Sequence, residues 1–179
     1  MLRLAAHDPA GVPHHAAVRR VPLHDLHRVG EPDRADRGDR AQHGAQRPAF
    51  RAAFVGFDPE KVAAFDDGDV QRLLADAGIV RNRAKIEATV HNAGAVLALD
   101  EPLDDLLWSF APDPATHRRP GTLAEVPATS PESVAMARTL KRKGFRFVGP
   151  TTCYALMQAA GLVDDHVRDC WRAGALRDA

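Results

Sequence analysis

The stretch Gly144-Phe-Arg-Phe-Val-Gly-Pro-Thr-Thr-Cys-Tyr-Ala-Leu-Met-Gln-Ala-Ala-Gly161 decides the fold. Its second half begins at a proline and ends at a glycine, as a helix commonly does. Ser130-Pro131 opens an earlier helix in the same way, with a capping hydroxyl before the proline, and Gly144 ends it. The sequence therefore predicts two helices joined by a tight hairpin that has a glycine at each end.

The rest of the chain after residue 47 also has the pattern of consecutive helices. The clearest start is Asp58-Pro59, where a carboxylate can cap a helix that proline opens. We expect helices over 48–57, 58–65, 67–77, 81–99 and 102–110, and a last helix from about residue 164. A proline-rich loop is expected over 111–131. Since no segment alternates with period two for long, the predicted fold class is all-α.

Residues 1–46 differ in composition from the rest of the chain. They contain no lysine and no aromatic residue, but they hold seven arginines and six histidines. Such a segment has little apolar surface to bury against the entropy of ordering it. One interpretation is an irregular charged arm. The other, which we favour, is a region read out of frame from G+C-rich DNA, because residues 47–179 are patterned as a domain from their first helix onward.

The whole chain of 179 residues suits one domain, with 45% apolar residues and formal net charge zero. No apolar run is long enough to span a bilayer, and the start lacks the apolar stretch of a secretory signal. Two cysteines are too few for a disulfide framework. We expect a cytoplasmic monomer that does not enter membranes.

The hairpin is the first candidate site. Amides at the start of the second helix carry the positive end of the helix dipole, which attracts anions. No acidic residue occurs over 133–163, whereas five basic residues do. A phosphate-backbone contact is one interpretation, and a solvated basic face beside an ordinary turn is the other. The candidate DNA-binding residues are Lys143, Gly144, Arg146, Phe147, Gly149, Thr151 and Thr152.

The second candidate is the pair His166 and Cys170. Four residues apart on a helix, an imidazole and a thiolate can reach one zinc ion. The alternative is a partly buried pair without metal, because two ligands do not close a tetrahedral site. No nucleophile or carboxylate pair has a persuasive spacing, so the catalytic residues stay unassigned.

Several segments together resemble type I DNA-3-methyladenine glycosylases over about three quarters of the chain. The segments that carry the resemblance are Phe57-Asp58-Pro59, the run from Asp76 to Ile86, Asn92-Ala93, Leu107-Trp108-Ser109-Phe110 and the run from Gly144 to His166. The resemblance implies a helix-hairpin-helix fold that flips a base out of duplex DNA. It also implies hydrolysis of the N-glycosidic bond of 3-methyladenine, and a structural zinc whose second pair of ligands matches His166 and Cys170.

The departures from the family lie in residues 1–46. The family opens with Cys-x-Trp, followed by Tyr-His-Asp, Glu-Trp-Gly and Gly-Leu-Ser-Trp, and none of these occurs there. The first two zinc ligands, the base-stacking aromatics and the pocket glutamate are therefore missing. We expect an incomplete zinc site and impaired glycosylase activity on alkylated DNA. The alternatives are a DNA-binding helix-hairpin-helix module without catalysis, or a non-functional gene product.

Overall fold

The computed structural model describes residues 40–113 and 116–170, and no strand occurs among them. The all-α prediction is confirmed. The α-helices are α1 (Arg40–Ala53), α2 (Pro59–Ala63), α3 (Asp67–Ala75), α4 (Arg83–Leu97), α5 (Leu103–Trp108), α6 (Pro131–Arg142) and α7 (Pro150–Ala160). Two 3-10 turns, η2 (Val55–Phe57) and η3 (Leu123–Glu125), lie between them. In this part of the chain, no helix is long and apolar enough to cross a membrane.

Side-chain caps fix where most of these helices begin. Asp58 accepts hydrogen bonds from the amides of Glu60 and Lys61 at the start of α2, as its position before a proline predicts. Ser130 forms a reciprocal capping box with Ser133 at the start of α6. Each cap satisfies amides that the first helical turn leaves without partners.

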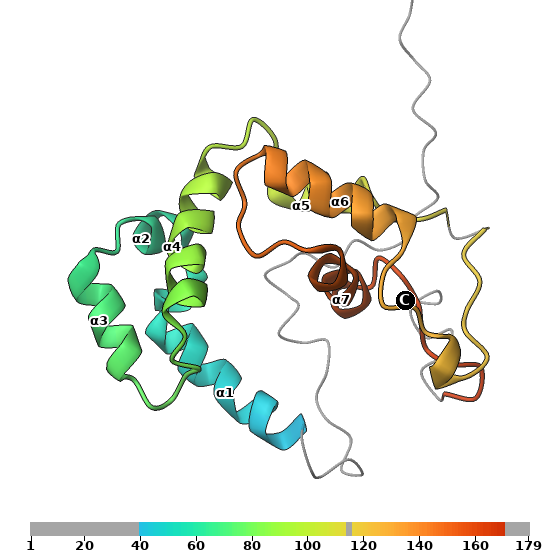
Figure 1. The fold of residues 1–179 in the computed structure, drawn as a ribbon, viewed down its shortest axis with the longest axis horizontal. Helices are drawn as coiled ribbons and strands as arrows, with labels where there is room; N and C mark the ends of the chain where they lie inside the picture. The colour runs from blue at the N-terminus through green and yellow to red at the C-terminus, as the bar shows by residue number, and fades with distance from the viewer. Residues whose placement is uncertain (1–39, 114–115, 171–179) are drawn as a thin grey trace, which may run out of the picture.

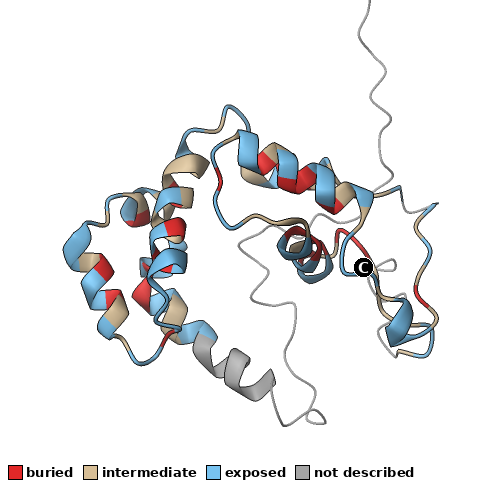
Figure 2. Cartoon of the chain, in the orientation of Figure 1, coloured by how far each residue is buried: buried red, intermediate tan, exposed pale blue. Residues whose placement is uncertain are grey.

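The helices pack around two apolar clusters, with α4 between them (Figure 1). The first cluster includes Phe54, Leu73 and Ile86 and joins α1, α2, α3 and the first part of α4. The second includes Met136 and Met157 and joins α5, α6 and α7. The last turns of α4 pack against this second cluster, so the helix contributes to both clusters. Figure 2 marks the buried positions of the helices in red.

The first helix, α1, differs at both ends from the range 48–57 that the sequence predicts. It begins at Arg40, inside the segment predicted to be irregular, and Pro48 lies within it rather than at its start. Proline removes one helical hydrogen bond, and here the helix continues past that loss. The helix ends at Ala53 because Val55, Gly56 and Phe57 have φ of 46°, 76° and 60°, which no right-handed helix accommodates. The prediction for residues 1–39 lies outside the described part of the chain.

The prediction of a last helix from about residue 164 is wrong. Gly161 has φ of 75° and ends α7 in a left-handed conformation, as predicted. After it, an oxygen of the Asp164 side chain accepts a hydrogen bond from the amide of His166 at 3.3 Å. No helix follows: residues 164–170 hold a turn at 168–169 and otherwise no regular secondary structure. The Asp165 side chain instead contacts Gln158 of α7 and His117 of the loop before η3.

Candidate nucleic-acid interface and metal pair

The hairpin between α6 and α7 starts at Gly144, whose backbone lies in the left-handed region that favours glycine. Gly144 has φ of 89°. The amide of Gly144 donates to the carbonyl of Lys141 at 3.1 Å, and the amide of Phe145 donates to the carbonyl of Leu140 at 3.0 Å. These two bonds form a Schellman motif, and Phe145 packs beside Leu140 in the second cluster. The chain therefore leaves α6 in a fixed direction.

The second glycine of the hairpin is not required by the fold. Gly149 has an ordinary φ of −77°, and a β-carbon added there would meet no atom within 4 Å. It precedes α7, whose first turn has no capping side chain. Thr151 and Thr152 in that turn are exposed. Since the protein's own packing leaves this space open, a glycine here allows an outside group to approach the helix amides closely.

Two side chains of α4 hold the hairpin in place. The amide group of Asn92 forms two hydrogen bonds with Arg146: Nδ2 donates to its carbonyl oxygen at 3.0 Å, and Oδ1 accepts from its backbone N–H at 2.8 Å. His91 Nε2 lies 2.8 Å from the carbonyl oxygen of Gly144. A carbonyl only accepts, so Nε2 carries the proton of this bond. The hairpin is therefore fixed from a helix far away in the sequence.

Positive charge surrounds the hairpin. Lys143 pairs with Glu101 of the α4–α5 connection at 3.0 Å, and Arg142 donates to the hydroxyl of Thr139 at 2.9 Å. The Lys143–Glu101 pair is partly exposed, and such an ion pair is weak and can exchange for another anion. Arg146, by contrast, contacts Asn92 through its backbone only, and Arg146 is exposed. The arrangement suits a polyanion.

The structure brings the seven candidate DNA-binding residues together along one continuous surface segment. Five of them are exposed, and the other two, Lys143 and Gly149, are half-buried. Phe147 is 60% exposed and has φ of 58°, which is unfavourable for a residue with a side chain. An apolar ring held outward in a strained conformation is typical of a functional surface rather than of packing.

A polar network holds the segment after α7. Asp165 accepts hydrogen bonds from the Tyr154 hydroxyl and from Gln158 Nε2, the latter at 2.9 Å, and lies 3.4 Å from His117 Nε2. Its side chain is only 7% exposed. Arg119 Nε lies 2.8 Å from the Asp164 carboxylate, an ion-pair distance without the alignment of a hydrogen bond. The network ties residues 164–165 to α7 and to the loop before η3.

This network places His166 and Cys170 beside each other without a helix. His166 Nδ1 lies 3.6 Å from Cys170 Sγ. Two ligands of one tetrahedral zinc, with Zn–N of about 2.0 Å and Zn–S of about 2.3 Å, would stand roughly 3.5 Å apart. The pair therefore fits two corners of a zinc site. Within 40–113 and 116–170, no cluster of three or more possible metal ligands occurs, so no third described His, Cys, Asp or Glu joins this pair.

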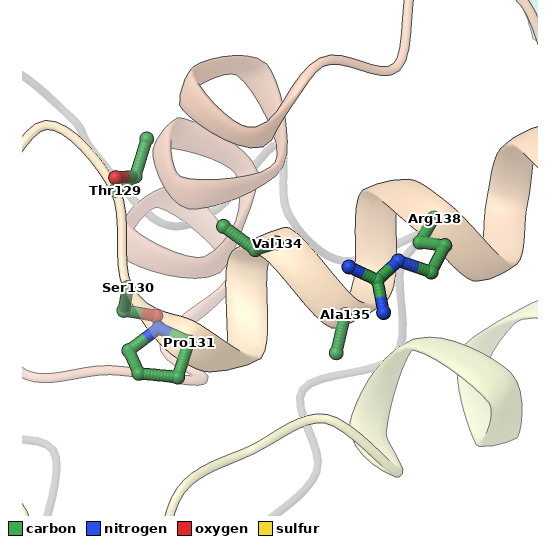
Figure 3. Close-up of a pocket in the computed structure, with 6 residues that line it drawn as sticks. All are labelled: Thr129, Ser130, Pro131, Val134, Ala135 and Arg138. Atoms are coloured by element: carbon green, nitrogen blue, oxygen red, sulfur yellow. The ribbon is translucent and has the colours of Figure 1, made fainter.

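A shallow pocket beside the start of α6 offers no surface for a flipped base. Its lining is Thr129, Ser130, Pro131, Val134, Ala135 and Arg138 (Figure 3). None of these side chains is aromatic or acidic, so the pocket provides neither a stacking partner nor a carboxylate.

The sequence analysis missed three residues that the structure makes important. His91, Asn92 and Asp165 act on segments far from them in the sequence or across a loop. Asn92 belongs to one of the segments that carry the family resemblance, which was the available signal. Its role stayed hidden because nothing local to α4 shows which loop lies against it.

Comparison with known proteins identifies close relatives. The family model described as methyladenine glycosylase matches residues 44–173. DNA-3-methyladenine glycosylase 1 of Escherichia coli is 47% identical over 128 residues, which cover 70% of this chain and 68% of that protein. DNA-3-methyladenine glycosylase of Haemophilus influenzae is 42% identical over 128 residues, which cover 70% of this chain and 69% of that protein.

Solved structures give the same result. A crystal structure of 3-methyladenine DNA glycosylase I matches with a TM-score of 0.69 and 42% identity, covering 73% of this chain and 74% of that one. A variant of 3-methyladenine DNA glycosylase I in complex with 3-methyladenine matches with a TM-score of 0.68 and 29% identity. That match covers 74% of this chain and 73% of the other. About three quarters of this chain therefore shares its helical arrangement with these enzymes.

Proposed function

Because the chain belongs to the methyladenine glycosylase family, we propose that it binds alkylated duplex DNA through the α6–α7 hairpin. The reaction of this family's DNA-3-methyladenine glycosylases is hydrolysis of the bond between 3-methyladenine and its sugar. A purine methylated at N3 is cationic and leaves readily, so recognition of the base and exclusion of normal bases form much of the enzyme's task. The hairpin's part is to hold the DNA backbone.

The observation that carries the DNA-binding proposal is the open space at Gly149. A phosphate oxygen that enters this space would meet the free amides of the first turn of α7 and the positive end of its dipole. Arg146 and Lys143 stand on the same hairpin and would add charge neutralisation. Such contacts are independent of base sequence, as an enzyme that searches long DNA for a rare lesion requires.

We propose that base excision by this chain is slower than in its relatives. Residues 1–46 contain no aromatic residue, so they cannot supply the ring on which a flipped base would stack. The family motifs that would bring a pocket glutamate are also missing from that segment. Duplex binding and excision are therefore expected to separate in this protein, with binding retained and excision reduced.

We also propose that His166 and Cys170 bind zinc, and that the ion would tie the C-terminal segment to another part of the protein. Their 3.6 Å separation supports the proposal. Two ligands alone give weak binding, because affinity depends on closing the tetrahedral site. We also propose that the protein is a cytoplasmic monomer. Light scattering on the purified chain would check its oligomeric state.

Two assays test the proposed function. Fluorescence anisotropy with a labelled duplex measures binding, and release of 3-methyladenine from alkylated DNA measures excision, with the Escherichia coli relative as the positive control. Salt-sensitive binding with slow release supports the proposal. Binding without any release would make the chain a DNA-binding module. A chain that shows neither, while its helical domain is folded, contradicts the proposal.

A further inference from the structure

Asn92 is the side chain that fixes the conformation of the hairpin. It lies near the middle of α4, 54 residues before Arg146, and its amide group occupies both backbone hydrogen-bonding groups of that residue. Only a side chain with a donor and an acceptor side by side can make this pair of bonds. Aspartate of the same shape has no donor, and leucine has neither.

The position of this contact in the hairpin lets it control the conformation of Phe147. Arg146 stands directly before Phe147, whose φ of 58° places it in the left-handed region. A residue with a side chain stays in that region only when its surroundings hold it there. With both backbone groups of Arg146 held by Asn92, and the Gly144 carbonyl held by His91 at 2.8 Å, the chain enters Phe147 in one orientation.

The helix that carries Asn92, α4, is held in place by contacts that do not involve the hairpin. α4 buries Ile86 and Ala93 in the first cluster, and α2 and α3 pack against it. Loss of the Asn92 amide would therefore loosen the hairpin while α4 stays in place. The geometry points to a positioning residue whose effect falls on the binding surface rather than on the core.

We infer that Asn92 positions the hairpin for DNA: by holding Arg146 it keeps the outward Phe147, the Arg146 side chain and the open Gly149 in the arrangement that a DNA backbone meets. The inference rests on the proposed function, because it names what holds the proposed surface. Asn92 does not itself touch DNA in this scheme. Because Asn92 already holds the hairpin in one conformation, DNA binding loses less conformational entropy in ordering it.

The experiment uses the full chain and three variants. Asn92→Asp keeps the shape and the acceptor but loses the donor, and Asn92→Leu loses both. Asn82→Ala is the matched control, because Asn82 also makes a side-chain hydrogen bond on α4, to the amide of Lys85 at 3.1 Å, and touches no part of the hairpin. For each protein we would measure duplex affinity, melting temperature and hydrogen exchange of the hairpin amides.

The expected result is a separation of binding from stability. Both Asn92 variants should bind an undamaged duplex about tenfold more weakly or worse, the size of effect that one or two lost hydrogen bonds produce. The Arg146 amide of Asn92→Leu should exchange faster, while melting falls no further than in Asn82→Ala. The control should bind as the wild type does.

Three results would overturn the inference. Asn92 variants that bind like the wild type, with the Arg146 amide exchanging faster, would show that the conformation of the hairpin does not govern binding. An equal loss of affinity in Asn82→Ala would assign the effect to stability. A wild-type chain that binds no duplex would overturn the proposed function and this inference with it, whereas the first two results leave the proposed function intact.

Discussion

Replacement of Tyr154 by phenylalanine tests the polar network that orders the segment carrying His166 and Cys170. Tyr154 lies in α7, is 3% exposed, and its hydroxyl donates to the Asp165 carboxylate. The variant removes that bond but leaves Asp165 with Gln158 at 2.9 Å and His117 at 3.4 Å. The carboxylate is therefore not left without partners, and the loss is that of one hydrogen bond to a charged group.

The strength of that hydrogen bond determines how much stability Tyr154→Phe loses at neutral pH. A hydrogen bond to a charged group contributes about 1.5–3 kcal/mol, so we expect Tyr154→Phe to lower the free energy of unfolding by about 2 kcal/mol. For a domain of this size, the same loss lowers the melting temperature by roughly 4–8 °C. Urea denaturation and thermal melting at pH 7 measure both quantities.

The pH dependence of this difference gives a second, independent check. Burial, together with the hydrogen bond and negative charge of Asp165, raises the pKa of Tyr154 well above its ordinary value of 10.0. Above about pH 10 the unfolded tyrosine loses its proton first, so the stability that Tyr154 contributes is present below that pH and declines as pH rises further. The advantage of the wild type over Tyr154→Phe should therefore shrink in alkali.

The chain contains one tyrosine, so tyrosinate absorbance reports Tyr154 alone. In the folded protein this absorbance should rise only at a pH well above that of the denatured protein. A loss of stability below about 0.5 kcal/mol in Tyr154→Phe, less than one net hydrogen bond is worth, would refute the reasoning. An ordinary tyrosine titration in the folded state would refute it as well.

Further substitutions test the two glycines of the hairpin and the metal pair. Gly144→Ala should destabilise the fold by about 1–2 kcal/mol, because φ of 89° is unfavourable for alanine although its β-carbon would meet nothing; unchanged urea denaturation would contradict this. Gly149→Ala should melt within a few degrees of the wild type but bind a duplex at least about tenfold more weakly, since its methyl group fills the space proposed for phosphate; equal affinity would remove that role. Cys170→Ser should weaken the binding of added zinc, measured by equilibrium titration of the purified chain, without changing duplex affinity, and an unchanged zinc affinity would exclude Cys170 as a ligand.

Local patterns predicted the part of the fold that local contacts determine. Ser130-Pro131, Gly144 and Asp58-Pro59 act through bonds within a few residues, and the helices they bound lie where the sequence places them. The candidate hairpin follows for the same reason, because its glycines and its basic residues are adjacent in the chain. Sequence therefore predicted the location of this surface and its charge.

Contacts between distant segments were beyond the reach of such patterns. The pairing of Asn92 with Arg146 and of Asp165 with His117 depends on which loops meet when both clusters form. The spacing of His166 and Cys170 suggested a helix, but the adjacent Asp165 contacts Gln158 and His117 on other elements, and no helix forms there. The two residues meet all the same at 3.6 Å, because turns as well as helices bring neighbours together.

The central claim is that the hairpin after α6 receives the DNA backbone, and backbone amide NMR tests it most directly. An undamaged duplex is titrated into the isotope-labelled chain, and shifts are followed for every assigned amide. The account predicts the largest changes at Arg146, Phe147, Thr151 and Thr152, diminishing as salt is raised, and little change in α3 on the far side of α4. Changes centred elsewhere, with the hairpin amides unmoved, would contradict it.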